Sequence, residues 1–140
     1  MFSALLNTNS RIGQILINGK GYFDFYSPEY VRFEIFHKEK IKTIGKLSED
    51  EFIETYSLIL RNITILYHSL IPPEIYRSGE LLCQDIDIDD TIFVAVSNFA
   101  KGILWTGDIK LIDGMKNKGY EQVIKTEELY QDFLIREMQK

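Results

Sequence analysis

The stretch spanning residues 85–111 constrains the fold more than any other part of this chain. It reads DIDIDDTIFVAVSNFAKGILWTGDIKL, in which four aspartates within six residues precede a long apolar run and a further aspartate, Asp108. The apolar run predicts a buried helix at Thr91–Ala100, and Ile103–Thr106 has the composition of a short strand. In a compact layered fold the two run antiparallel, so the start of the helix lies beside the end of the strand.

Strand and helix patterns alternate along the rest of the chain. Further helices are predicted at residues 10–18, 28–42, 48–60, 72–82, 110–118 and from 126 onward. Further strands are predicted at residues 22–26, 63–67 and 121–124. This alternation predicts an α/β fold with a three-layer, Rossmann-like parallel sheet and helices on both faces, in a single domain at residues 1–140. No strand pattern precedes the first helix, although a regular alternation would place one there.

The composition narrows the class of protein. Hydrophobic residues make up 45% and charged residues 26% of the chain, which is typical of a globular domain. The single cysteine, Cys83, excludes an internal disulfide and paired-cysteine metal motifs, and we expect a buried, inert thiol.

No run of 18 apolar residues exists and Met1–Leu6 lacks a basic start, so we expect a cytoplasmic protein with no membrane partner. The net charge of -5 does not by itself indicate nucleic-acid binding, but it leaves room for a local basic patch.

Acidic residues are predicted to meet at one edge of the sheet. Asp90 starts the apolar helix and Asp108 follows the strand, so both lie at the carboxyl edge, where open parallel sheets bind ligands. Glu34, in the second turn of the helix after the first strand, and Asp87, one turn ahead of Asp90, can join them. Grouped carboxylates repel each other unless a cation neutralises them. Mg²⁺ or Mn²⁺ suits such oxygen ligands and can activate a water for attack on a phosphodiester.

A purely structural interpretation of the same residues stays open. Asp89 and Asp90 can cap free N–H groups at the start of a helix, and Asp108 can cap the helix that follows the strand. Asp85 and Asp89 are expected to be solvated.

Three segments together resemble the PIN domain family of nucleases. They are SPEYVRFEI, DIDIDDTIFVAV and LWTGDIKLI, and the opening FSALLNTNSRIGQIL is similar to the family's first helical segment. The resemblance covers essentially the whole chain. It implies a Rossmann-like fold and an Mg²⁺- or Mn²⁺-dependent ribonuclease that hydrolyses RNA. Many members are toxins of bacterial toxin–antitoxin pairs and often dimerise, so a cognate antitoxin and a homodimer are the protein partners that it implies.

The resemblance also assigns roles to individual residues. Glu34, Asp90 and Asp108 match the family's catalytic, metal-binding acidic residues, and Asp87 matches an additional acidic position. Thr106 matches the hydroxyl residue that precedes the last aspartate and is expected to hydrogen-bond and orient the site.

Basic residues flank the predicted acidic edge. They are Arg11, Arg32, Lys101 and Lys110. A solvated charge is the ordinary interpretation of each, and contact with RNA phosphates is the functional one, expected above all of Arg11, Arg32 and Lys110.

One family element has no counterpart in this sequence. Family members begin with a strand that ends in an aspartate, and that position falls ahead of Phe2. The N-terminal strand and one metal ligand are therefore expected to be missing, through a late gene start, a trimmed chain or a degenerate protein. Two alternatives to the ribonuclease follow: a non-catalytic, PIN-like binding module that has lost a metal ligand, and a phosphotransfer or phosphatase domain that uses its aspartates.

Overall fold

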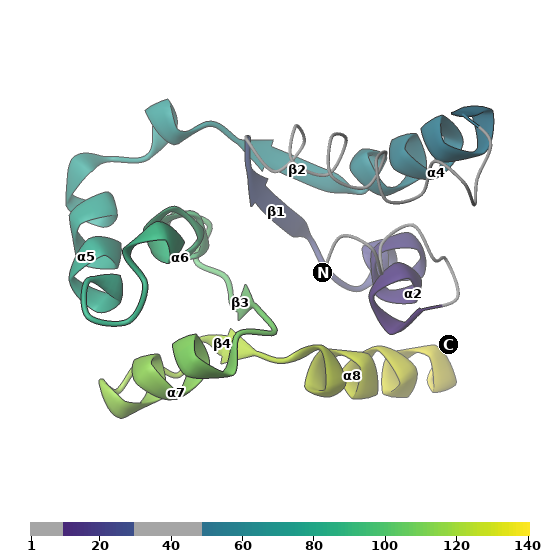
Figure 1. Cartoon of the computed structure of the whole chain (residues 1–140). Coiled ribbons are helices and arrows are strands. Elements are labelled where there is room, and N and C mark those ends of the chain that lie inside the picture. Colours follow the sequence, from purple (N-terminus) through teal and green to yellow (C-terminus); the bar gives the residue numbers. More distant parts are fainter. Residues whose placement is uncertain (1–9, 30–48) are drawn as a thin grey trace. The chain divides into compact units, whose positions relative to one another are not determined.

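The computed structural model describes residues 10–29 and 49–140 (Figure 1). The α-helices are α2 (Arg11–Asn18), α4 (Glu49–Arg61), α5 (Pro73–Cys83), α6 (Thr91–Phe99), α7 (Ile109–Asn117) and α8 (Thr126–Met138). The strands are β1 (Phe25–Pro28), β2 (Ile63–Leu66), β3 (Leu104–Trp105) and β4 (Val123–Ile124). Short 3-10 helices are η1 (Gly19–Gly21), η2 (His68–Leu70) and η3 (Ile88–Asp90). The described chain is thus mixed α/β, mostly helical with short strands.

The described strands form two pairs. β3 and β4 are parallel, with Leu104 opposite Val123 and Trp105 opposite Ile124, and β1 pairs with β2. The described residues also divide into two compact units, one formed by Ile65–Glu128 with Tyr26–Pro28 and the other by the remainder. The three-layer sheet and the single domain at residues 1–140 stay predictions.

The predicted element boundaries match the structure closely except near residue 27. The aromatic strand begins at Phe25, because Tyr22 closes the 3-10 turn η1, and it continues through Pro28. The predicted helix start at residue 28 is therefore wrong. A proline fits the end of a short strand as well as the first turn of a helix. The predicted helix at 28–42, which carries Glu34 and Arg32, lies outside the described residues apart from its start.

The first unit is organised around α2. The Ser10 hydroxyl caps this helix by accepting a hydrogen bond from the Gly13 N–H at 3.0 Å, and Ile15 and Leu16 on its inner face are buried. At the other end, the Asn62 side-chain amide donates to the Leu16 carbonyl at 2.8 Å. Carbonyls at the end of a helix lack partners within it, so Asn62 supplies one and stabilises the end of α2.

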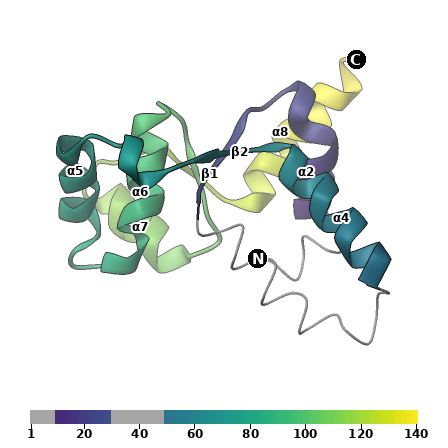
Figure 2. The ribbon, with the colours of Figure 1, turned by 90° about the horizontal axis from the view of Figure 1, so that it is seen from above.

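The second unit contains the core that supports the acidic segment. Helices α5, α6 and α7 lie side by side (Figure 2), and β3 contacts α6 and pairs with β4. The core cluster comprises Cys83, Val94, Leu104, Leu111, Ile112, Met115 and Val123. Helices α5 and α6 cross closely at Gly79, where an added Cβ would lie 3.2 Å from the Thr91 carbonyl oxygen. Asp87, Asp90 and Asp108 all belong to this unit.

Among residues 10–29 and 49–140, no helix is long and apolar enough to cross a membrane.

Candidate acidic site

A tight turn brings Asp90 to the start of α6. The Asp87 carboxylate caps this turn by accepting a hydrogen bond from the Asp89 N–H at 3.0 Å, and the Asp90 N–H donates to the Asp87 carbonyl at 3.1 Å. The buried Thr91 hydroxyl donates to the Ile88 carbonyl at 2.6 Å. These bonds hold the backbone of the turn without using the Asp90 side chain.

Asp90 does not act as a helix cap. It precedes α6 but makes no side-chain capping bond, and its Oδ2 atom is buried with no hydrogen-bond partner in the described part of the chain. The capping interpretation is therefore wrong for Asp90. A buried carboxylate oxygen without a partner is costly, since polar atoms removed from water normally find one.

Asp108 is positioned by a second local arrangement, after β3. Its N–H donates to the Thr106 hydroxyl at 3.1 Å, and its Oδ1 accepts a hydrogen bond from the Leu111 N–H at 3.2 Å. Asp108 is therefore the N-cap of α7, as the structural interpretation predicted. Thr106 contacts the backbone N–H of Asp108, so it orients the turn rather than the carboxylate itself.

The electrostatics show that these carboxylates share one environment. The pKa of Asp90 is raised above its ordinary value, first by partial burial and then by the negative charges of Asp87, Asp108 and Asp89. Burial also raises the pKa of the Cys83 thiol, and the Asp90 charge raises it further. Asp87 and Asp108 thus lie near enough for their charges to act on Asp90, and a shared metal site stays a prediction.

The donor chemistry suits a hard divalent cation. The Asp90 Oδ2 atom is buried without a partner in the described part of the chain, and the charges of further carboxylates act on it, an environment that Mg²⁺ or Mn²⁺ relieves. Across the described ranges, however, no group of three or more His, Cys, Asp or Glu side chains is arranged to hold an ion. Glu34, the remaining predicted ligand, lies outside those ranges.

The other predicted residues lie in varied surroundings. Lys110 is exposed in the first turn of α7, two residues after Asp108. Arg11 belongs to the first unit, where its guanidinium lies 5.4 Å from the centre of the Tyr130 ring. Arg32 lies outside the described residues. Their contact with RNA stays a prediction.

The expectation that Asp85 is simply solvated is wrong. Asp85 is exposed but not merely solvated, because the Lys118 ammonium bonds to its carboxylate, which lowers the pKa of Asp85. Lys118 is distant in sequence, at the end of α7, so no local pattern indicated this pair.

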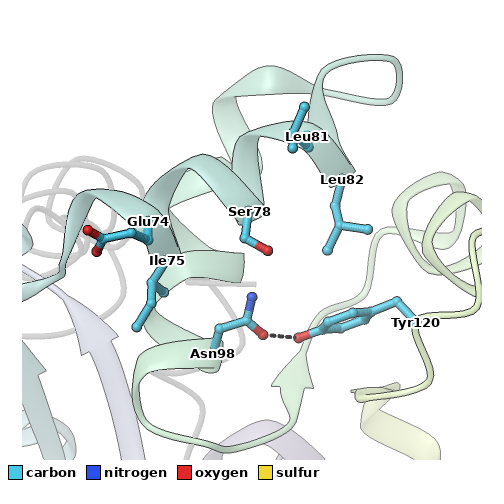
Figure 3. A pocket seen from close by; sticks show the side chains of 7 residues that line it. All are labelled: Glu74, Ile75, Ser78, Leu81, Leu82, Asn98 and Tyr120. Atoms are coloured by element: carbon cyan, nitrogen blue, oxygen red, sulfur yellow. Dashed lines mark hydrogen bonds between the residues drawn. The ribbon is translucent and has the colours of Figure 1, made fainter.

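A separate pocket of about 610 Å³ lies on the second unit (Figure 3). Its lining residues are Glu74, Ile75, Ser78, Leu81, Leu82, Asn98 and Tyr120. Ser78 and Leu82 of α5 point toward Asn98 and Tyr120. The Tyr120 hydroxyl donates a hydrogen bond to the side-chain carbonyl of Asn98 at 2.6 Å. None of the candidate carboxylates lines this pocket, so it is distinct from the acidic site.

The described structure therefore defines a mixed α/β protein with an acidic cluster at the starts of η3, α6 and α7. The family model for the PIN domain matches residues 1–131, and the chain belongs to the PIN domain family. PIN domains are generally nucleases that depend on a divalent metal. Neither a curated protein nor a solved structure matches the chain.

Proposed function

We propose that this protein is an Mg²⁺- or Mn²⁺-dependent endoribonuclease. The observation that carries the proposal is the Asp90 Oδ2 atom, which is buried near the charges of Asp87 and Asp108 and has no partner among the described residues. A cluster that repels itself destabilises the fold unless a cation occupies it, and membership of a nuclease family gives that cation a use.

Each residue has a distinct part in the proposed reaction. Asp90 and Asp108 hold the metal, with Asp87 and Glu34 completing the set of ligands. When bound, Mg²⁺ or Mn²⁺ supplies Lewis acidity that activates a water and stabilises charge on the phosphodiester. The Oδ1 of Asp108 is already used by the Leu111 N–H, which fixes the carboxylate and leaves Oδ2 for the metal.

The rest of the chain has supporting roles in this proposal. Thr106 holds the turn that presents Asp108. Lys110, Arg11 and Arg32 bind RNA phosphates and offset the acidic charge near the substrate. The strands and helices belong to one three-layer, Rossmann-like domain, as the family resemblance implies. The protein acts in the cytoplasm, as the sequence composition predicts. By the same resemblance, it is a toxin, forms a homodimer and is held by a cognate antitoxin.

The test is cleavage of single-stranded RNA in Mn²⁺ by the wild type and Asp90→Asn. Asp90→Asn should abolish cleavage, and EDTA should abolish it in the wild type. Asp113→Asn is the matched control, because Asp113 is exposed on α7 and is not among the charges that raise the pKa of Asp90. Equal cleavage by the wild type and Asp90→Asn would exclude the proposed site.

A non-catalytic binding module is the second candidate. The observation that favours it is that the described residues alone do not assemble three metal-ligating side chains. Calorimetric titration separates the candidates. Binding of Mn²⁺ that Asp90→Asn removes supports the nuclease, whereas RNA binding without any Mn²⁺ binding at millimolar concentration supports the module.

A further inference from the structure

The side chain of Ile86 packs directly on the backbone of α7. A Cβ added at Gly114, in the interior of that helix, would lie 2.5 Å from Cδ1 and 2.9 Å from Cγ1 of Ile86. These distances are shorter than real Cβ contacts, so the Ile86 side chain occupies the space that any larger residue at position 114 would need. Ile86 is partly buried and packs against the core cluster of the second unit.

The glycine at position 114 is explained by this contact. Glycine in the interior of a helix lowers helix stability relative to alanine. A special backbone conformation does not account for it, because Gly119 is the glycine with positive φ in the described chain. Close approach of another segment is the remaining common reason for a glycine here.

A second contact joins the same two segments. The Lys118 ammonium, just after α7, donates to the Leu82 carbonyl at 2.8 Å and pairs with Asp85. Both partners precede the acidic turn. Since Asp85 is largely exposed and Lys118 is partly exposed, this ion pair contributes little by itself. The ion pair does, however, add a polar contact between the same two segments that the apolar Ile86–Gly114 contact joins.

We propose that Ile86 and Gly114 are positioning residues that hold the acidic turn on α7. Ile86 immediately precedes Asp87, and α7 connects Gly114 rigidly to its N-cap, Asp108. The carboxylates repel each other, so they supply no force that keeps the turn and the helix together. The Ile86–Gly114 contact contributes such a force at a point away from the charges, together with the Lys118 contacts and the packing of α7 in the core. This inference rests on the proposed function, because the spacing of the carboxylates matters for the metal binding that the proposed function requires.

The decisive variant is Gly114→Ala. The new methyl group displaces Ile86 and with it the turn, so the affinity for Mn²⁺ measured by calorimetry should fall by about tenfold, as is typical when the support of a metal ligand is lost. Ile86→Val removes Cδ1, the nearest atom, and leaves the close approach of Cγ1 at 2.9 Å, so adding it to Gly114→Ala should restore part of the affinity. Gly102→Ala is the matched control, because a Cβ there meets nothing within 4 Å.

A second measurement is independent of metal binding. In EDTA, Gly114→Ala should shift the backbone amide NMR signals of residues 87–90, and the added Ile86→Val should return them toward their wild-type positions. If wild-type protein binds no Mn²⁺, the proposed function fails while these signals still test the positioning role. Unchanged signals in Gly114→Ala, or a shift that Ile86→Val does not reverse, would overturn the inference.

Should Gly114→Ala fail to fold, Ile86→Ala takes its place, because it removes the contact without adding an atom. Hydrogen exchange at residues 87–90 should then be faster than in the wild type. Exchange at the wild-type rate would contradict the positioning role.

Discussion

Replacing Asp90 by asparagine should stabilise the metal-free protein while it removes activity. The carboxylate is partly buried, its Oδ2 has no partner in the described structure, and Asp87, Asp108 and Asp89 all raise its pKa. Asparagine has nearly the same shape but no charge, and its amide can donate to a neighbouring carboxylate. The substitution therefore removes repulsion and leaves the packing of α6 in place.

The size of the effect follows from the exposure of the cluster. Asp87 and Asp108 are exposed, so water and salt screen their interaction with Asp90. Charge pairs at a protein surface contribute about 0.2–1 kcal/mol each, and we expect like-charge pairs to cost similar amounts. Relief of the interactions with Asp87 and Asp108 should thus increase the free energy of unfolding by about 1 kcal/mol at neutral pH.

The stability difference between the wild type and Asp90→Asn should also depend on pH. Because the pKa of Asp90 in the folded protein lies above its ordinary value of 3.8, the folded state binds a proton more readily than the unfolded state does. The contribution of Asp90 to the stability of the wild type should therefore fall as pH rises from 3.8 through its folded pKa. Asp90→Asn does not lose this stability. The difference in free energy of unfolding between the variant and the wild type should therefore be small below pH 3.8 and largest above the folded pKa of Asp90.

Urea unfolding of both proteins in EDTA, from acid to neutral pH, measures this difference. Adding Mn²⁺ should then stabilise the wild type more than the variant, because a ligand stabilises the state that binds it. A variant that is less stable than the wild type at neutral pH, or a difference that does not change with pH, would refute the reasoning about repulsion.

Three further outcomes are expected. Asp108→Asn and Asp108→Ala should both abolish RNA cleavage, but in urea unfolding Asp108→Ala alone should lose about 1 kcal/mol, because asparagine still caps α7. Gly119→Ala should cost about 1 kcal/mol in the same measurement, since Gly119 adopts φ 84°. Cys83, fully buried and with a raised pKa, should react with a thiol reagent only after urea has unfolded the protein.

The sequence predicted those parts of the structure that depend on local signals. The apolar run of α6 and the T-G-D segment before α7 set their elements within a residue or two. Knowing that a helix and the next strand run antiparallel was then enough to place Asp90 near Asp108. The prediction erred at Ser27–Pro28, where the same two residues are compatible with a helix start and with the end of a strand.

Contacts between distant segments could not be predicted in this way. Ile86 and Gly114 meet only after α7 has packed on the core, and neither residue has a local pattern that indicates the contact. The same holds for Lys118 and Asp85, because each charge taken alone is indistinguishable from an ordinary solvated one.

Asp90 is the residue at which local and global requirements conflict. An aspartate before a helix normally caps it and stabilises it. Here Asp87 caps the preceding turn and Thr91 binds the Ile88 carbonyl, so the backbone is satisfied while the Asp90 carboxylate has no capping role. A side chain that breaks a favourable local rule and faces like charges is expected at functional sites. In the described part of the chain, the backbone of the turn has its hydrogen bonds while the Oδ2 atom of Asp90 has none. This combination supports a metal-binding role for Asp90 more strongly than the number of aspartates does.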